Sequence, residues 1–93
     1  YNVYPKEVEL VLDAIPGVIE SAVVGLPHPD FGEAVTAVLA VAKDCPLTEA
    51  EVIAKVKGEL AGYKVPKRVH FVADLPRNAM GKVQKAELRK SLA

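Results

Sequence analysis

The sequence has a single cysteine, Cys45, and no tryptophan, and aromatic residues of all kinds make up only 5% of it. One cysteine excludes an internal disulfide and favours a reducing, cytoplasmic location. Cys45 lies in a turn-like stretch between Lys43-Asp44 and Pro46, where we expect a loop thiol rather than a nucleophile. No apolar run approaches the roughly 18 residues that predict a membrane helix, so we expect no membrane contact.

The opening residues, Tyr1-Asn2-Val3-Tyr4, contain no methionine. The start of the sequence also lacks the pattern of a signal peptide, in which a charged region is followed by an apolar region and a cleavage site of small residues. We therefore expect the opening residues to come from the interior of a longer protein. The 93 residues are 51% hydrophobic and 26% charged, which is typical of a globular chain rather than a disordered one. A chain of this length buries only one small core, so residues 1–93 are expected to form one domain.

Acidic and basic residues are equal in number, 12 of each, but they are unevenly placed along the chain. Residues 1–54 contain two Lys or Arg against nine Asp or Glu, whereas residues 55–93 contain ten against three. This asymmetry favours contact between the basic half and something anionic. Nucleotide phosphates, nucleic acid and the acidic face of a neighbouring domain all fit, and charge alone does not choose among them.

Hydrophobic periodicity and turn residues predict helix, strand, strand, helix, strand and helix, in that order. The expected ranges are Pro5–Ile15, Val18–Leu26, Glu33–Ala42, Thr48 to a stop at Gly62, Val69–Val72 and Lys85–Leu92. Thr48 with Glu51 forms a capping box at the start of the second helix. The segments Pro27–Gly32 and Ala73–Lys82 are expected to be loops.

The second predicted strand is apolar enough to lie near the sheet centre, and the short return before it favours antiparallel pairing with the first. The expected fold is therefore a small α+β domain, with a mixed sheet of about three strands covered by three helices.

Lys82 is the residue most suited to chemistry, because it follows Gly81 in the last predicted loop and carries a long, charged side chain. Gly81 gives the backbone conformational freedom, and an ammonium that reaches out of its domain suits a reaction that builds negative charge on oxygen. A plain solvated lysine is the alternative. A phosphate-binding P-loop is excluded, because Pro76 stands where glycine is needed and Val83 where Ser or Thr is needed. His28 and His70 have no partner at ligand spacing, so no metal site is expected.

Four ordered segments resemble landmarks of the C-terminal domain of adenylate-forming enzymes, the superfamily of acyl-CoA synthetases, luciferases and peptide-synthetase adenylation domains. They are Tyr1–Glu9, Val18–Gly25 with Pro29–Glu33, Tyr63–Lys67, and Leu75–Lys85. The last one, Leu-Pro-Arg-Asn-Ala-Met-Gly-Lys-Val-Gln-Lys, looks most like malonyl-CoA synthetases and close relatives.

The resemblance implies an ATP-dependent acid–CoA ligase whose large N-terminal domain is absent from this chain. Such a ligase uses ATP with Mg²⁺ to convert a carboxylic acid into an acyl-adenylate, and then transfers the acyl group to CoA. Lys82, supported by Gly81 and Arg77, would act in the adenylation step. After the lid rotates, Tyr1, Asn2 and Val3 would line the pantetheine tunnel. The isolated chain would be inactive and would bind neither AMP nor CoA tightly.

Two further roles follow from the resemblance. The segment that runs from Pro76 through four further residues to Gly81-Lys82 resembles the sites that protein lysine acetyltransferases modify. A deacetylase would reverse that modification. Phe31 and Tyr63 could each stack on the adenine of CoA, while the basic residues Lys64, Lys67 and Arg68 contact its phosphates. The alternative for both rings is that they close the edges of a small core.

Two other functions remain open at this level. The acceptor thiol could belong to a carrier protein rather than to CoA, because the basic half would suit an acidic carrier. A small nucleic-acid-binding module is the other, but the basic residues do not follow an aromatic sheet face and the pI is near neutral. We expect no nucleic acid partner.

Overall fold

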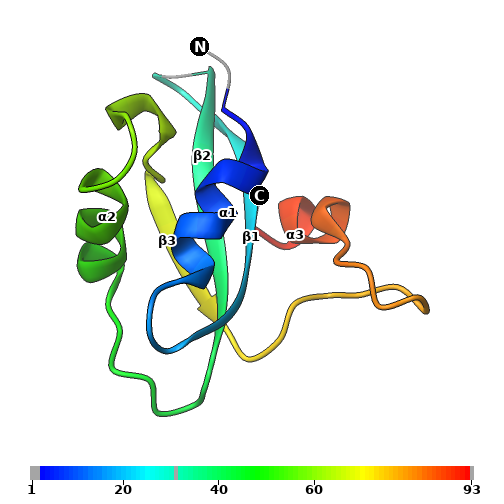
Figure 1. Ribbon diagram of the computed structural model, residues 1–93. Helices are drawn as coiled ribbons and strands as arrows, with labels where there is room; N and C mark the ends of the chain where they lie inside the picture. Colours follow the sequence, from blue (N-terminus) through cyan, green and yellow to red (C-terminus); the bar gives the residue numbers. More distant parts are fainter. Residues whose placement is uncertain (1–2, 31, 93) are drawn as a thin grey trace.

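The computed structural model describes residues 3–30 and 32–92. Its elements are α1 (Pro5–Asp13), β1 (Val18–His28), β2 (Gly32–Val41), α2 (Glu49–Lys57), a short 3₁₀ turn η1 (Gly62–Lys64), β3 (Arg68–Val72) and α3 (Lys85–Leu92). The predicted α+β architecture of three helices on a three-stranded sheet is confirmed (Figure 1).

The sheet has the order β1-β2-β3, with β1 antiparallel and β3 parallel to the central strand β2. Helices α1 and α2 cover one face and α3 covers the other (Figure 1). Neighbouring residues Val38 and Leu39 of β2 are therefore both fully buried, because they point to opposite faces. Burial on both faces explains why β2 is continuously apolar instead of alternating.

Two apolar cores lie on the two faces of the sheet. The core under α1 and α2 contains Val8, Leu12, Ile15, Val23, Ala37, Leu39, Val52, Val56, Val65 and Val69. The core under α3 contains Ala22, Val24, Val38, Ala40, Leu75 and Leu88. The smaller second core holds α3 and the segment before it against the sheet.

Several element boundaries differ from the sequence-based expectation, and two of these differences have a plain physical reason. Pro27 and His28 belong to β1 and pair with β2, although proline was expected to end the strand. β1 is an edge strand, and an edge strand tolerates proline because one of its sides has no ladder to maintain. The helix α2 ends at Lys57 and not at Gly62, because Gly58, a poor helix former, already stands at its C-cap. The capping box of Thr48 and Glu51 is present as predicted.

The outer edge of β1 is covered by acidic side chains from α1. The Glu9 carboxylate accepts hydrogen bonds from the backbone N–H of Val23, at 2.8 Å, and its same oxygen forms an ion pair with the Lys85 ammonium, also at 2.8 Å. The Ser21 hydroxyl donates to the Asp13 carboxylate at 2.6 Å. Glu9 therefore joins α1, the edge of β1 and the first residue of α3.

Burial predicts a large difference between two leucine-to-alanine substitutions. Leu39 is 0% exposed in the centre of the sheet, whereas Leu10 is 60% exposed on α1. Leu39→Ala should lower the free energy of unfolding by about 2–5 kcal/mol, since it leaves a cavity. Leu10→Ala should change it by less than about 0.5 kcal/mol. Urea unfolding measures both, and equal losses would contradict the assignment of the core.

Candidate functional site

Residues 76–84 form a projecting hairpin that carries Lys82, here called the Lys82 hairpin. It leaves the sheet after the buried Leu75 and returns directly into α3, extending to one side of the molecule (Figure 1). Its two arms pair through a bridge between Arg77 and Val83, and the Gln84 N–H donates to the Pro76 carbonyl at 2.8 Å. The segment predicted as a loop is thus a hydrogen-bonded hairpin.

The tip of the Lys82 hairpin is a tight turn. The Asn78 N–H donates to the Lys82 carbonyl and the Gly81 N–H donates to the Asn78 carbonyl, both at 2.9 Å. Gly81 has φ +83°, a left-handed conformation that costs other residues about 1–2 kcal/mol. This hydrogen-bond pattern is that of a three-residue hairpin loop with glycine at its left-handed position. The conformational freedom expected of Gly81 is thus used to form a turn directly before Lys82.

Asn78 is a residue of the site that sequence reasoning missed. Its side-chain carbonyl oxygen accepts hydrogen bonds from the N–H groups of Met80, at 2.9 Å, and Lys82, at 3.0 Å. A signal was present in the sequence, since asparagine favours the first position of a type I turn and glycine the fourth. Asn78 and Gly81 occupy those two positions.

Ion pairs hold both ends of the Lys82 hairpin to the rest of the domain. Arg77 forms an ion pair with Glu20 of β1 and also donates to the Gly81 carbonyl at 2.7 Å. At the other end, Lys85 pairs with Glu9. Arg77, predicted as a supporting residue, thus contacts both the sheet and the turn beside Lys82.

The three ion pairs of the described residues also account for part of the charge asymmetry. Each joins a base of the second half to an acid of the first: Lys64 to Glu7, Arg77 to Glu20 and Lys85 to Glu9. The acidic half of the same chain was not among the partners that the sequence led us to expect for the basic half. Lys82 is exposed, and its ammonium contacts no acid within residues 3–30 and 32–92. Its charge is available to an anion from outside the chain.

Four of the predicted CoA-contacting residues lie elsewhere, in η1 and at the start of β3, across the molecule from the Lys82 hairpin (Figure 1). Tyr63 is 43% exposed in η1, so part of its side chain is accessible from outside the domain. Lys64 lies 5.6 Å from the centre of that ring and pairs with Glu7 at 2.8 Å. The hydrogen bond to Glu7 raises the pKa of Lys64. Lys67 and Arg68 are exposed at the start of β3, and Phe31 lies outside the described residues.

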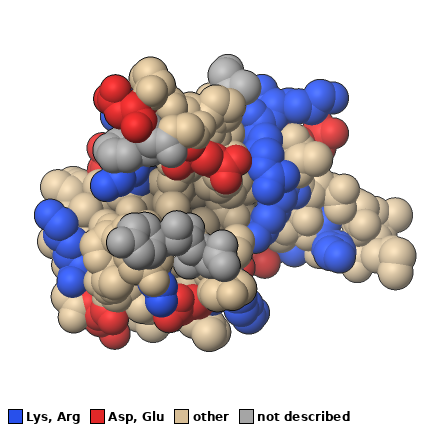
Figure 2. All heavy atoms as spheres, turned by 90° about the horizontal axis from the view of Figure 1, so that it is seen from above, with Lys and Arg blue, Asp and Glu red and all other residues tan. Residues whose placement is uncertain are grey.

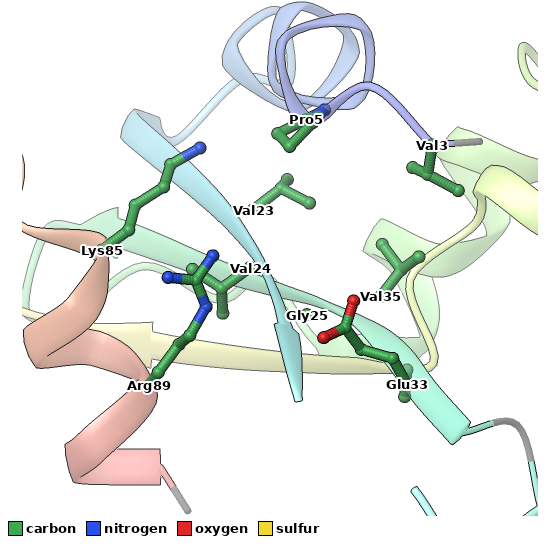
Figure 3. Close-up of a pocket in the computed structure, with 10 residues that line it drawn as sticks. Val3, Pro5, Val23, Val24, Gly25, Glu33, Val35, Lys85 and Arg89 are labelled. Atoms are coloured by element: carbon green, nitrogen blue, oxygen red, sulfur yellow. The ribbon is translucent and has the colours of Figure 1, made fainter. Parts of the chain in front are cut away.

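A pocket of about 450 Å³ lies between the start of α1, the β1–β2 pair and α3 (Figure 3). Val3, one of the predicted tunnel residues, lines it, while Tyr1 and Asn2 lie outside the described residues. Arg89 and Glu33 approach the pocket from opposite sides (Figure 3). From above, basic side chains stand in a row beside a hollow on the α3 side (Figure 2). Lys82 is not among the residues that line this pocket.

Two other kinds of site are absent from the described part of the chain. No three His, Cys, Asp or Glu side chains there gather into a group that could hold a metal ion. None of the helices in that part has the length and apolar character needed to cross a membrane.

Comparison with known proteins gives a consistent result. A family model described as the AMP-binding enzyme C-terminal domain matches residues 7–82. The long-chain-fatty-acid–CoA ligase of Escherichia coli O6:H1 is 46% identical over 89 residues, which cover 96% of this chain and 16% of that protein.

Solved structures agree with the sequence match. ATP-bound MatB from Rhodopseudomonas palustris has a TM-score of 0.94 and 57% identity, covering 98% of this chain and 18% of that one. The amide bond synthetase McbA from Marinactinospora thermotolerans has a TM-score of 0.91 and 42% identity at the same coverage. This chain thus spans less than a fifth of the length of each of these relatives. It belongs to the family of C-terminal domains of adenylate-forming, AMP-binding enzymes.

Proposed function

We propose that this chain is the lid of an ATP-dependent acid–CoA ligase and that Lys82 supplies the positive charge for the adenylation step. The observation that carries the proposal is the placement of Lys82. Its ammonium is exposed, contacts no acid among the described residues and stands beside the tip of a hairpin held at both ends. Such a group can enter a neighbouring domain without first breaking an ion pair of its own.

The chemistry of adenylation calls for a cation of this kind. A carboxylate oxygen attacks the α-phosphorus of ATP, the bond to the β-phosphate oxygen breaks, and pyrophosphate leaves. Both reactants are anions, and negative charge builds on the α-phosphate oxygens in the transition state. An ammonium between the carboxylate and the α-phosphate offsets their repulsion and stabilises that charge, most effectively when it is already in position. No proton moves to or from Lys82 in this step.

Transfer to CoA would use other parts of the surface. The group of Tyr63, Lys64, Lys67 and Arg68 lies away from the Lys82 hairpin (Figure 1), and Lys82 is not among the residues that line the pocket of Val3. We infer that the lid turns between steps, withdrawing Lys82 and bringing the segment of Tyr1–Val3 toward the thiol. Within residues 3–30 and 32–92, no group of three or more His, Cys, Asp or Glu side chains could hold a metal ion, and the Mg²⁺ that accompanies ATP would be bound mainly by the nucleotide phosphates.

The acid and the acceptor are less closely defined by this domain. Resemblance of residues 75–85 to malonyl-CoA synthetases favours malonate or a methylmalonate-like acid. Relatives with this domain include a long-chain-fatty-acid–CoA ligase and an amide bond synthetase, so the domain serves more than one acceptor. A carrier-protein thiol is the alternative acceptor for this chain, because its basic half would suit an acidic carrier. The cytoplasmic location of the protein stays a prediction. Because the chain belongs to a family of enzyme domains, the alternative of a nucleic-acid-binding module has no support.

Replacing Lys82 tests the proposed division of labour. In the complete ligase, Lys82→Ala should slow acyl-adenylate formation by about 10²–10³-fold, as expected on losing a positioned charge. Thioester formation from supplied acyl-adenylate and CoA should persist, because Lys82 has left the site by then. Lys57→Ala removes an exposed lysine of α2 and should leave both rates unchanged. Equal loss in both half-reactions would refute the assignment.

Replacing Tyr63 tests the CoA contact. Tyr63→Ala should raise the apparent KM for CoA about fivefold or more, as expected on losing one base–aromatic stack, and leave adenylation unchanged. Tyr63→Phe keeps the ring and should behave like the parent enzyme. Steady-state kinetics with varied CoA measure the effect. If adenylation and thioester formation weaken together in Tyr63→Ala, the ring serves packing and not CoA.

Lys82 also suits modification, since its ammonium is exposed and lies on a projecting hairpin. We expect a protein lysine acetyltransferase with acetyl-CoA to acetylate Lys82, and adenylation to fall because the charge is removed. A deacetylase should restore the rate. Mass spectrometry locates the acetyl group, and the Lys82→Arg variant should keep its rate under the same treatment. An unmodified Lys82 would contradict this prediction.

A further inference from the structure

We propose that Asn78 is a positioning residue for the adenylation step: its side-chain carbonyl oxygen sets the direction in which Lys82 leaves the hairpin. The inference rests on the proposed function of Lys82 and assigns a role to a residue that sequence reasoning left without one.

The contacts of Asn78 converge on Lys82. The Asn78 side chain accepts from the Lys82 N–H at 3.0 Å, and the Asn78 backbone N–H donates to the Lys82 carbonyl at 2.9 Å. Both backbone polar groups of Lys82 are thus bonded to one residue. The same side chain also accepts from the Met80 N–H at 2.9 Å, and the Asn78 backbone carbonyl accepts from the Gly81 N–H. Every residue from Met80 to Lys82 is therefore tied to Asn78.

The side-chain contacts of Asn78 do little for the stability of the fold. Asn78, Met80 and Lys82 are all exposed, so water can satisfy the two N–H groups if the asparagine oxygen is removed. The hairpin also keeps its Arg77–Glu20 and Lys85–Glu9 ion pairs and its buried neighbours. Removal of the oxygen should therefore loosen the peptide of Lys82 without unfolding the domain.

A loosened Lys82 matters for chemistry, because its ammonium stands at the end of a long, flexible side chain. That side chain branches from the Cα atom between the backbone N–H and the carbonyl of Lys82, so the orientation of these two bonded groups decides the direction in which the ammonium can reach. A displacement of about 1 Å at a reacting group can reduce a rate by about 10²-fold. Asn78 therefore acts on adenylation through Lys82, without itself touching the substrates.

Half-reaction kinetics of the complete ligase test this role. Asn78→Ala should slow acyl-adenylate formation by roughly 10- to 100-fold and leave thioester formation from supplied acyl-adenylate unchanged. Asn78→Ser keeps an uncharged acceptor oxygen at a turn position that serine also favours, and should recover part of the rate. Met80→Ala is the matched control, since it alters the same turn but removes only a side chain that is 90% exposed. It should match the parent enzyme.

The double variant separates this inference from the proposed function. Because Asn78 works through Lys82, Asn78→Ala should cause no further loss in a Lys82→Ala background. If Lys82→Ala slows adenylation but Asn78→Ala does not, the role of Asn78 is overturned and that of Lys82 stands. If Lys82→Ala is itself harmless, both fail. A fall in both half-reactions, or failure of Asn78→Ser to recover any of the rate, would also overturn the positioning role.

Discussion

The free side of β1 has backbone groups that need partners, and Glu9 of α1, which accepts from one of them, also helps to fix the position of the Lys82 hairpin. Glu9 accepts from the Val23 N–H and pairs with Lys85 through the same oxygen. An edge strand left uncovered would be open to pairing with another chain. Because Lys85 begins α3 directly after the Lys82 hairpin, the contact that protects the edge also fixes one end of the hairpin. Glu20, on the same strand, fixes the other end through Arg77.

This arrangement allows the Lys82 hairpin to be held in place although Lys82 itself is exposed. In sequence, the hairpin lies between two buried leucines, Leu75 and Leu88. Both belong to the core under α3. Its tip is far from that core, yet the hydrogen bonds of Asn78 and the left-handed Gly81 order the turn locally. An exposed cation can thus be both accessible and oriented. Under the proposed function these are the two properties that a lid needs when it brings a charge to substrates bound by another domain.

Local sequence signals predicted much of the fold. The capping box of Thr48 and Glu51 involves neighbouring residues only, and the apolar run of β2 reflects burial on both faces. Pro27 was placed outside β1 because sequence does not show which strand lies at the edge of the sheet. The ion pairs of Arg77 and Lys85 likewise depend on acids more than 50 positions away along the chain. Counting charges in each half of the sequence does not show which base pairs with which acid. Lys82 could be singled out from its resemblance to a known motif, whereas its fixed turn became visible only through the contacts of Asn78.

The most direct test of the role of Lys82 is to remove its ammonium and then restore it chemically. In the complete ligase, Lys82→Cys should lose acyl-adenylate formation, and aminoethylation of the new thiol should return an ammonium to nearly the same place. The experiment is made in a Cys45→Ser background, with Lys82→Ala treated identically as the control. We predict that adenylation, followed by ATP–pyrophosphate exchange, recovers only in the aminoethylated Cys variant. An unchanged rate in Lys82→Cys, or no recovery after aminoethylation, would contradict the assignment of a positioned charge to Lys82.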